Sequence, residues 1–154
     1  MTILEKLSNL NMDLPSAPLA AGLYKTVLIQ DRLLMFSGHL PILKDGSMIT
    51  GRVGDDLSVE EGWRAARQVG LNIISSLQAE LGDLERVDRV TKILGMVNAD
   101  PSFTQHPQVI NGCSELFKEL WGDDCGVGVR SAFGVSGLPA NVAVEIEGSF
   151  LLKA

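Results

Sequence analysis

The sequence contains few of the residues from which disulfide frameworks and metal sites are built. Its 154 residues include two cysteines, Cys113 and Cys125, and two histidines. Cys113 falls in an expected helix and Cys125 in a Gly/Asp loop, and neither belongs to a Cys-x-x-Cys pair or a Cys/His cluster with metal-ligand spacing. We therefore expect two free thiols and no metal site.

Basic residues and long apolar runs are also scarce. Lys and Arg number 13 against 19 Asp and Glu, which gives a net charge of −6 at pH 7. Because phosphate backbones are bound through Lys and Arg, we expect no nucleic-acid partner. The N-terminal stretch MTILEKLSNLNMDLP lacks the basic start and apolar run of a signal peptide, and no later apolar run is long enough to span a membrane. The expectation is a soluble, cytoplasmic protein without a membrane partner.

Short apolar segments bounded by turn residues predict a sheet. Apolar residues make up 45% of the chain, which suits one domain covering residues 1–154. KTVLIQ and RLLMFSG flank Asp31 and predict a tight hairpin that ends at Ser37 and Gly38. VDRVTKILGMVNA has apolar residues on both alternating faces, as is typical of a central strand. The last two strands are expected at Val127–Val135 and Val142–Leu152, joined by SGLPAN.

Two long helices are expected between these strands. The first begins at Ser58, where Ser-x-x-Glu with Glu61 forms a capping-box pattern, and ends near Gly82. The second has Pro107 near its first turn and stops at Gly122. Trp63 and Cys113, which lie on the apolar stripes of these helices, are interpreted as packing residues.

The order of elements predicts an α+β fold in which helices cover one face of a sheet. A short helix over residues 3–10 comes first, and an irregular, proline-containing segment then leads to Tyr24. No further helix of comparable length is available for the second face of the sheet. Another subunit is the natural candidate to cover it.

The last two strands carry charges that a core segment does not need. If they pair as an antiparallel hairpin, Arg130 lies near Glu145 across the ladder, and Glu145 shares a face with Glu147. One interpretation is a solvated salt bridge, which contributes little. In the other, the planar guanidinium of Arg130 holds a small carboxylic acid and Glu145 accepts a proton from an attacking water. The pattern alone leaves both open.

Three segments resemble the RidA/YjgF family of imine deaminases, formerly called L-PSP endoribonucleases. They are GLYKTVLIQDRLLMFSGHLP, VINGCSELFKELWG and VRSAFGVSGLPANVAVEIE. The similarity runs from about Gly22 onward, so residues 1–21 form an N-terminal extension, and GRVGDDLSVEEG is similar to a longer subgroup of the family. The resemblance implies a chorismate-mutase-like fold with two main helices on one face of the sheet. It also implies a homotrimer with active sites between subunits.

The activity that the resemblance implies is hydrolysis of small 2-imino or enamine acids, such as 2-aminoacrylate, to 2-keto acids and ammonia, without a cofactor. Arg130 matches the family's carboxylate-binding arginine, and Glu145 matches the acid that positions or activates water. The remaining matches are the active-site tyrosine, the turn that lines the pocket and the asparagine early in the second helix: Tyr24, Ser37, Gly38 and Asn111. Glu147 matches no catalytic position and is interpreted as structural.

Three positions depart from the family pattern. Leu23 replaces a proline, His39 a glutamine and Ala132 a common cysteine. These changes leave room for a second hypothesis, a non-catalytic ligand-binding or regulatory member of the superfamily. A third, RNA cleavage, is disfavoured by the acidic charge balance. His39 and His106 lack ligand partners at a recognisable spacing and are interpreted as structural.

Overall fold

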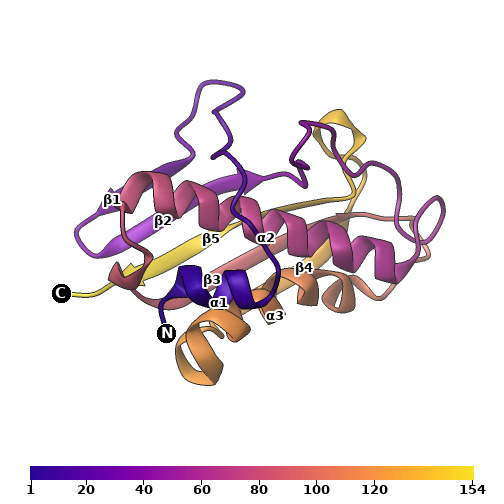
Figure 1. The fold of residues 1–154 in the computed structure, drawn as a ribbon. Coiled ribbons are helices and arrows are strands. Elements are labelled where there is room, and N and C mark those ends of the chain that lie inside the picture. The colour runs from indigo at the N-terminus through magenta and orange to yellow at the C-terminus, as the bar shows by residue number, and fades with distance from the viewer.

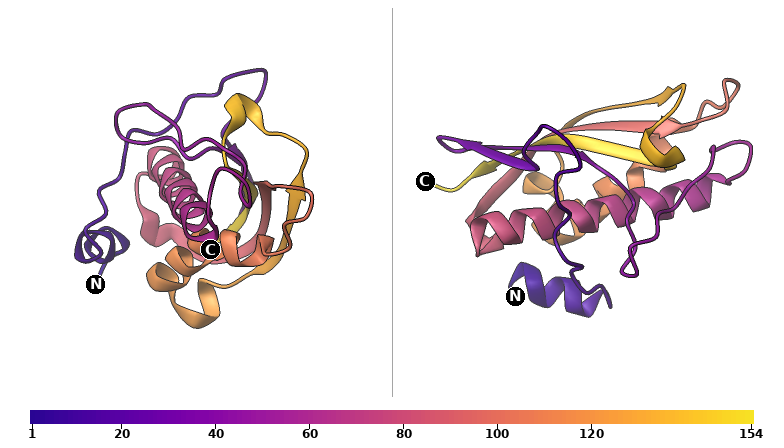
Figure 2. Two further views of the ribbon diagram at one scale, coloured as in Figure 1. Left: turned by 90° about the vertical axis from the view of Figure 1, so that its right-hand side faces the viewer. Right: turned by 90° about the horizontal axis from the view of Figure 1, so that it is seen from above.

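The computed structural model describes residues 1–154 and confirms an α+β fold. A five-stranded mixed sheet carries α2 and α3 on one face, and α1 lies beyond this helical layer (Figures 1 and 2). The elements in chain order are α1 (Ile3–Asn9), β1 (Val27–Gln30), β2 (Leu33–His39), α2 (Val59–Leu81), η1 (Leu84–Arg86), β3 (Val87–Asn98), α3 (His106–Cys125), β4 (Val129–Val135), η2 (Pro139–Asn141) and β5 (Val144–Leu152).

The ends of the two long helices follow from local capping chemistry. Ser58 caps α2 by accepting a hydrogen bond from the backbone N–H of Glu61, at 3.1 Å. Gly82 ends the helix in the left-handed conformation, with φ of 73°. In α3 the predicted stop at Gly122 is a break with φ of 85°, after which one more helical turn runs to Cys125.

The strand order is β1-β2-β5-β3-β4. The first hairpin forms as predicted, with Asp31 at φ 55° in its turn. The predicted final hairpin is wrong, because β3 lies between its two strands. β4 pairs with β3 in parallel, and β5 pairs antiparallel with both β2 and β3. The second apolar face of β3, with Leu94 and Met96, lies on the side of the sheet that no helix covers, and β4 is left as an edge strand.

This topology separates Arg130 from Glu145. Arg130 lies opposite Ile93 on β3, so both side chains point toward the helices. Glu145 lies between Val144 and Ile146, which are fully buried under the helices, so its own side chain points to the other face. The predicted proximity of Arg130 to Glu145 across a ladder is therefore wrong: they lie on opposite faces of the sheet, with β3 between their strands.

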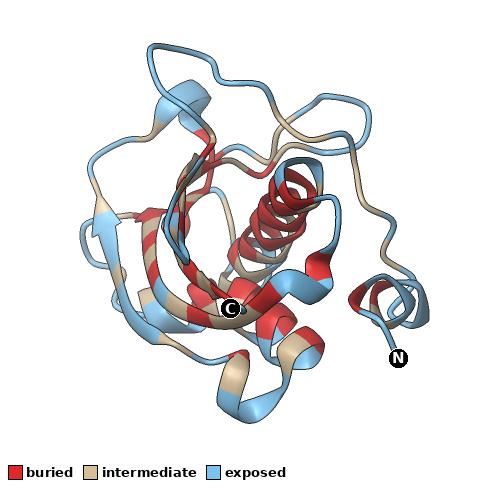
Figure 3. Ribbon diagram, turned by 90° about the vertical axis from the view of Figure 1, so that its left-hand side faces the viewer, coloured by how far each residue is buried: buried red, intermediate tan, exposed pale blue.

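The core fills the space between the sheet and the two long helices (Figure 3). Cys113 is buried there as a free thiol, as predicted, and Cys125 is also free. The N-terminal helix adds Ile3 and Leu7 to this core, and Lys6 Nζ donates a hydrogen bond to the carbonyl of Leu120 at 2.7 Å. None of the helices combines the length and apolarity needed to cross a membrane.

The second face of the sheet has no helix over it. Side chains at least one-third exposed include large apolar ones from both edges of the sheet, Leu28 and Leu33 on the β1–β2 hairpin and Val129 and Phe133 on β4. A second molecule that covered this face would remove their apolar surface from water.

The packing of α2 on α3 depends on Gly112. A Cβ atom at this position would lie 2.9 Å from the backbone nitrogen of Arg67 and nearer still to the carbonyl of Trp63. Backbone cannot move aside as a flexible side chain does, so we expect Gly112→Ala to lower the free energy of unfolding by about 2 kcal/mol or more. Gly137→Ala is the matched control, because it faces open space without a positive φ. Urea denaturation of both variants measures the difference, and equal stability would contradict the close packing.

Candidate active site in two halves

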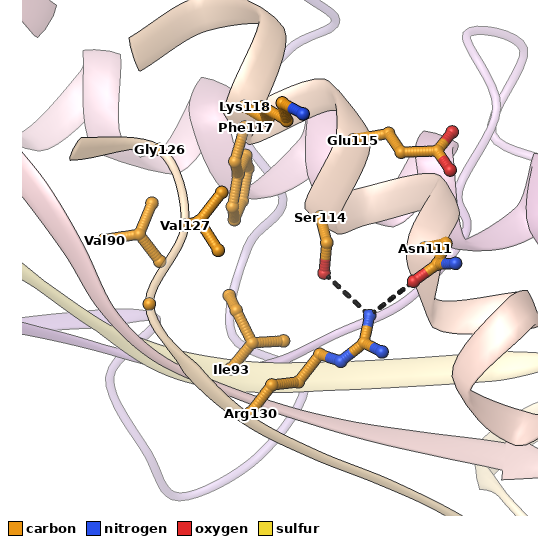
Figure 4. A pocket seen from close by; sticks show the side chains of 11 residues that line it. Val90, Ile93, Asn111, Ser114, Glu115, Phe117, Lys118, Gly126, Val127 and Arg130 are labelled. Atoms are coloured by element: carbon orange, nitrogen blue, oxygen red, sulfur yellow. Dashed lines mark hydrogen bonds between the residues drawn. The ribbon is translucent and has the colours of Figure 1, made fainter. Parts of the chain in front are cut away.

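The first half of the site is built around Arg130 at the exposed edge of the sheet. Its Nη1 donates hydrogen bonds to Asn111 Oδ1 at 2.7 Å and to Ser114 Oγ at 3.1 Å (Figure 4). Asn111 and Ser114 are three residues apart on α3 and therefore lie on one side of the helix. Both bonds use the same nitrogen, so Nε and Nη2 make no hydrogen bond within the chain.

A cavity of about 460 Å³ adjoins this guanidinium. Arg130 lies at one end of the space in Figure 4, and apolar side chains of β3, α3 and the loop before β4 form the opposite wall. Those apolar residues are Val90, Phe117 and Val127, and Ile93 lies next to Arg130. The arrangement suits a small molecule with a carboxylate at one end and an apolar group at the other.

The second half lies on the other face, where β2 meets β5. Gly38 is next to Glu145: a Cβ atom at Gly38 would lie 2.8 Å from the carboxyl carbon of Glu145. Ser37 Oγ donates a hydrogen bond to the carbonyl of Lys25, and the hydroxyl of Tyr24 accepts one from the backbone N–H of Ala21 at 3.0 Å. The irregular segment before β1 is thus attached to the end of β2.

Tyr24 and Ser37 share a cavity of about 350 Å³ with Lys25 and Glu147. Glu147 points to the same face as Glu145, two residues along β5. Glu147, which the sequence analysis interpreted as structural, thus lines this cavity, on the face that its period-two spacing from Glu145 predicted.

The surroundings of the Glu145 carboxyl group raise its pKa. Partial burial raises its pKa above the usual range, and the negative charge of Glu147 raises the pKa further. No arginine or lysine forms an ion pair with Glu145 to offset these effects. A carboxyl group of raised pKa is a better proton acceptor when ionised, and can also return the proton at a higher pH.

The predicted site residues therefore fall into two groups that one chain does not bring together. Arg130 and Asn111 lie on the helix side at the edge strand, and Tyr24, Ser37, Gly38 and Glu145 lie toward the open face. Ser114, which the sequence interpretation missed, joins the first group. Its signal was the three-residue spacing from Asn111 on the same helix. On the open face, Met96 lies directly opposite Glu145 in the β3–β5 ladder.

The departing positions are spread over both groups. Ala132 pairs with Gly95 two residues beyond Arg130, and Leu23 is fully exposed beside Tyr24.

His106 packs its ring edge-to-face on Phe103 with the ring centroids 5.3 Å apart. No group of three or more His, Cys, Asp or Glu side chains is arranged to hold a metal ion.

Residues 5–146 match the model of the family described as "YjgF/chorismate mutase-like, putative endoribonuclease". The chain belongs to the YjgF family. Protein TCP17 of Trypanosoma cruzi is 41% identical to it over 141 residues, which are 92% of this chain and 88% of that protein. The solved structure of Atu1372 from Agrobacterium tumefaciens, described as a protein of unknown function, is 36% identical, with a TM-score of 0.90 over 98% of this chain and 92% of that chain.

A structural neighbour of lower sequence identity shows only that the fold is shared. RidA from an Antarctic Psychrobacter is 23% identical, with a TM-score of 0.62 over 89% of this chain and 94% of that chain. Atu1372 has the higher TM-score, and its match covers 98% of the 154 residues, which leaves about 3 outside it. The α1 helix therefore lies within the fold that the two chains share. In this chain an N-terminal helix, which packs on α3, is thus added to the sheet and two long helices of the YjgF family.

The raised pKa of Glu145 has a consequence for stability. A folded-state pKa above the unfolded-state value means that the protein loses stability as the pH rises through the interval between the two. Glu145→Gln removes this loss. We expect the variant to be more stable than wild type at neutral pH, and its advantage to disappear as the pH falls below the ordinary pKa of glutamate.

Thermal or urea unfolding across this pH range, at one fixed protein concentration, measures the difference. Carboxyl groups remote from Glu145 titrate alike in both proteins and cancel in the comparison. A stability difference that stays constant with pH would contradict the raised pKa.

Proposed function

We propose that the protein hydrolyses small 2-imino or enamine acids to 2-keto acids and ammonia. The observation that carries the proposal is the Arg130 guanidinium, which Asn111 and Ser114 hold through Nη1 alone. The Nε–Nη2 edge remains free, and this edge of a guanidinium fits a carboxylate through two parallel hydrogen bonds. Membership of the YjgF family and the fold shared with a protein named RidA support the same chemistry.

In the proposed reaction Arg130 anchors the substrate carboxylate and thereby fixes the neighbouring C=N carbon. The Glu145 carboxylate takes a proton from a water molecule as its oxygen bonds to that carbon and the imine nitrogen gains a proton from solvent, which gives a carbinolamine. The amine nitrogen is then protonated by Glu145 or solvent. The C–N bond breaks as the hydroxyl group gives up its proton to Glu145 or solvent and the C=O bond forms, and ammonia leaves. Tyr24 and Ser37 orient the reacting groups by hydrogen bonding.

This scheme requires the two halves of the site to come from different subunits. Arg130 and Glu145 lie on opposite faces of the sheet, so we propose that the edge strand β4 of one subunit meets the open face of the next. Such a contact joins two different surfaces, so it can be repeated head to tail around a closed ring. The resemblance to the RidA/YjgF family favours a ring of three copies, the homotrimer. The exposed apolar side chains Leu28, Leu33, Val129 and Phe133 would be covered in it.

The alternative of a non-catalytic binding or regulatory protein rests on Leu23, His39 and Ala132. It predicts that a 2-keto acid binds without any imine turnover. RNA cleavage, suggested by the family description, is the weaker alternative because the chain carries a net charge of −6.

The test is an imine hydrolysis assay in which an amino acid oxidase generates the substrate in situ. Because a hydrogen bond to a charged group contributes roughly 1.5–3 kcal/mol, we expect Arg130→Ala to lower kcat/KM by about 10- to 150-fold. Arg64→Ala is the control: Arg64 lies exposed on α2, paired with Glu60, outside both halves of the site. Arg64→Ala should leave turnover unchanged.

Undiminished turnover in Arg130→Ala would remove the carboxylate-anchoring role. An inactive wild-type protein that still binds a 2-keto acid would favour the binding protein instead.

A further inference from the structure

His39 lies directly behind the Ser37–Gly38 segment of the second half-site. It is 3% exposed, and its ring bridges two elements of the fold. Nδ1 lies 2.6 Å from the carbonyl oxygen of Ser37, and Nε2 lies 2.8 Å from Oγ of Ser76 on α2. The imidazole therefore connects the end of β2 to the longest helix.

The two partners fix the protonation of the ring. A carbonyl oxygen can only accept, so Nδ1 carries the hydrogen and donates it to Ser37. In the neutral ring Nε2 then accepts from the hydroxyl of Ser76. Burial lowers the pKa of His39, which keeps this neutral form dominant at neutral pH. The ring also packs edge-to-face on Phe36, with the centroids 5.9 Å apart.

The segment that this ring holds is a β-bulge. Phe36 lies opposite Gly148 and His39 lies opposite Ile146, so three steps along β2 match two along β5. The extra residue interrupts the ladder and leaves Ser37 and Gly38 out of regular pairing. A bulge re-aims nearby groups, and this one sets Gly38 against the Glu145 carboxylate.

We infer that His39 is a positioning residue for the second half of the site. By tying the Ser37 carbonyl to α2, it fixes the bulge that determines where Ser37 and Gly38 lie relative to Glu145. Its effect on catalysis rests on the proposed function, whereas its effect on the bulge does not. The sequence analysis interpreted this lone histidine as structural, and it could not identify the partners, a backbone carbonyl and a serine far along the chain.

Three substitutions separate positioning from general packing. His39→Ala removes both hydrogen bonds, and Ser76→Ala removes the hydroxyl that anchors Nε2. His39→Asn retains an N–H donor near the position of Nδ1 and can still reach the Ser37 carbonyl. Ser75→Ala is the matched control: Ser75 is the adjacent buried serine of α2, and its hydroxyl bonds to the carbonyl of Leu71 instead.

In the imine assay we expect His39→Ala to lower kcat by about 10- to 100-fold, because misplacing catalytic groups by about 1 Å has effects of this size. KM should change less than about twofold, since Arg130, which binds the carboxylate, lies on the other face. Ser76→Ala and His39→Asn, which both keep a bond to the Ser37 carbonyl but break the link to α2, should also lower kcat, and Ser75→Ala should match wild type. An unchanged kcat in His39→Ala with an active wild-type protein would overturn the catalytic effect.

The backbone amide NMR signals of Ser37 and Gly38 provide a readout that needs no activity. Because replacing His39 changes the residue next to Gly38, Ser76→Ala decides this readout: the signals should shift in Ser76→Ala and stay in place in Ser75→Ala. Signals that do not move would overturn the inference. If His39→Ala fails to fold, Ser76→Ala carries both measurements. If wild type has no imine activity, the proposed function fails, and the amide signals still decide whether His39 holds the bulge.

Discussion

The parallel pairing of β3 with β4 is the constraint on which the arrangement of the site depends. Parallel neighbours need a crossover connection, and α3 supplies it between the two strands. The crossover lays α3 along the edge strand, which brings Asn111 and Ser114 to the Arg130 guanidinium. The same pairing removes β4 from β5. One topological choice therefore builds the first half of the site and separates it from the second.

Local signals predicted the elements, and the long-range pairing escaped them. Ser58 and Gly82 mark the ends of α2 through capping that involves neighbouring residues alone, and Asp31 marks its hairpin in the same way. A short loop between two apolar segments suits a hairpin, yet here the chain from β4 enters the sheet again on the far side of β3. Whether β4 pairs with β5 or with β3 depends on which strands become the neighbours of β3, and this is a property of the whole sheet.

The candidate residues were identified because they match a family pattern. How they divide between the two faces of the sheet was not predicted. Spacing along the chain suggested that Arg130 and Glu145 meet, although the alternation of faces on two strands separated by a third places them apart. His39 was interpreted as structural, and its burial agrees with this, but its link to α2 could not be predicted because its partner Ser76 is 37 residues away. The second half of the site also bears a cost: Glu145 is partly buried beside another carboxylate, an arrangement that function explains better than stability.

Mixed oligomers test most directly whether the site is assembled from two subunits. Arg130→Ala and Glu145→Gln chains, each expected to be strongly impaired alone, can be co-expressed with different tags so that hybrid oligomers form. If each site takes its arginine from one subunit and its glutamate from the next, random mixing at equal amounts gives about one-quarter of the sites both intact groups. We predict recovery to about one-quarter of the wild-type imine hydrolysis rate under these conditions. Hybrids that stay as inactive as the separate variants would contradict a site shared between subunits.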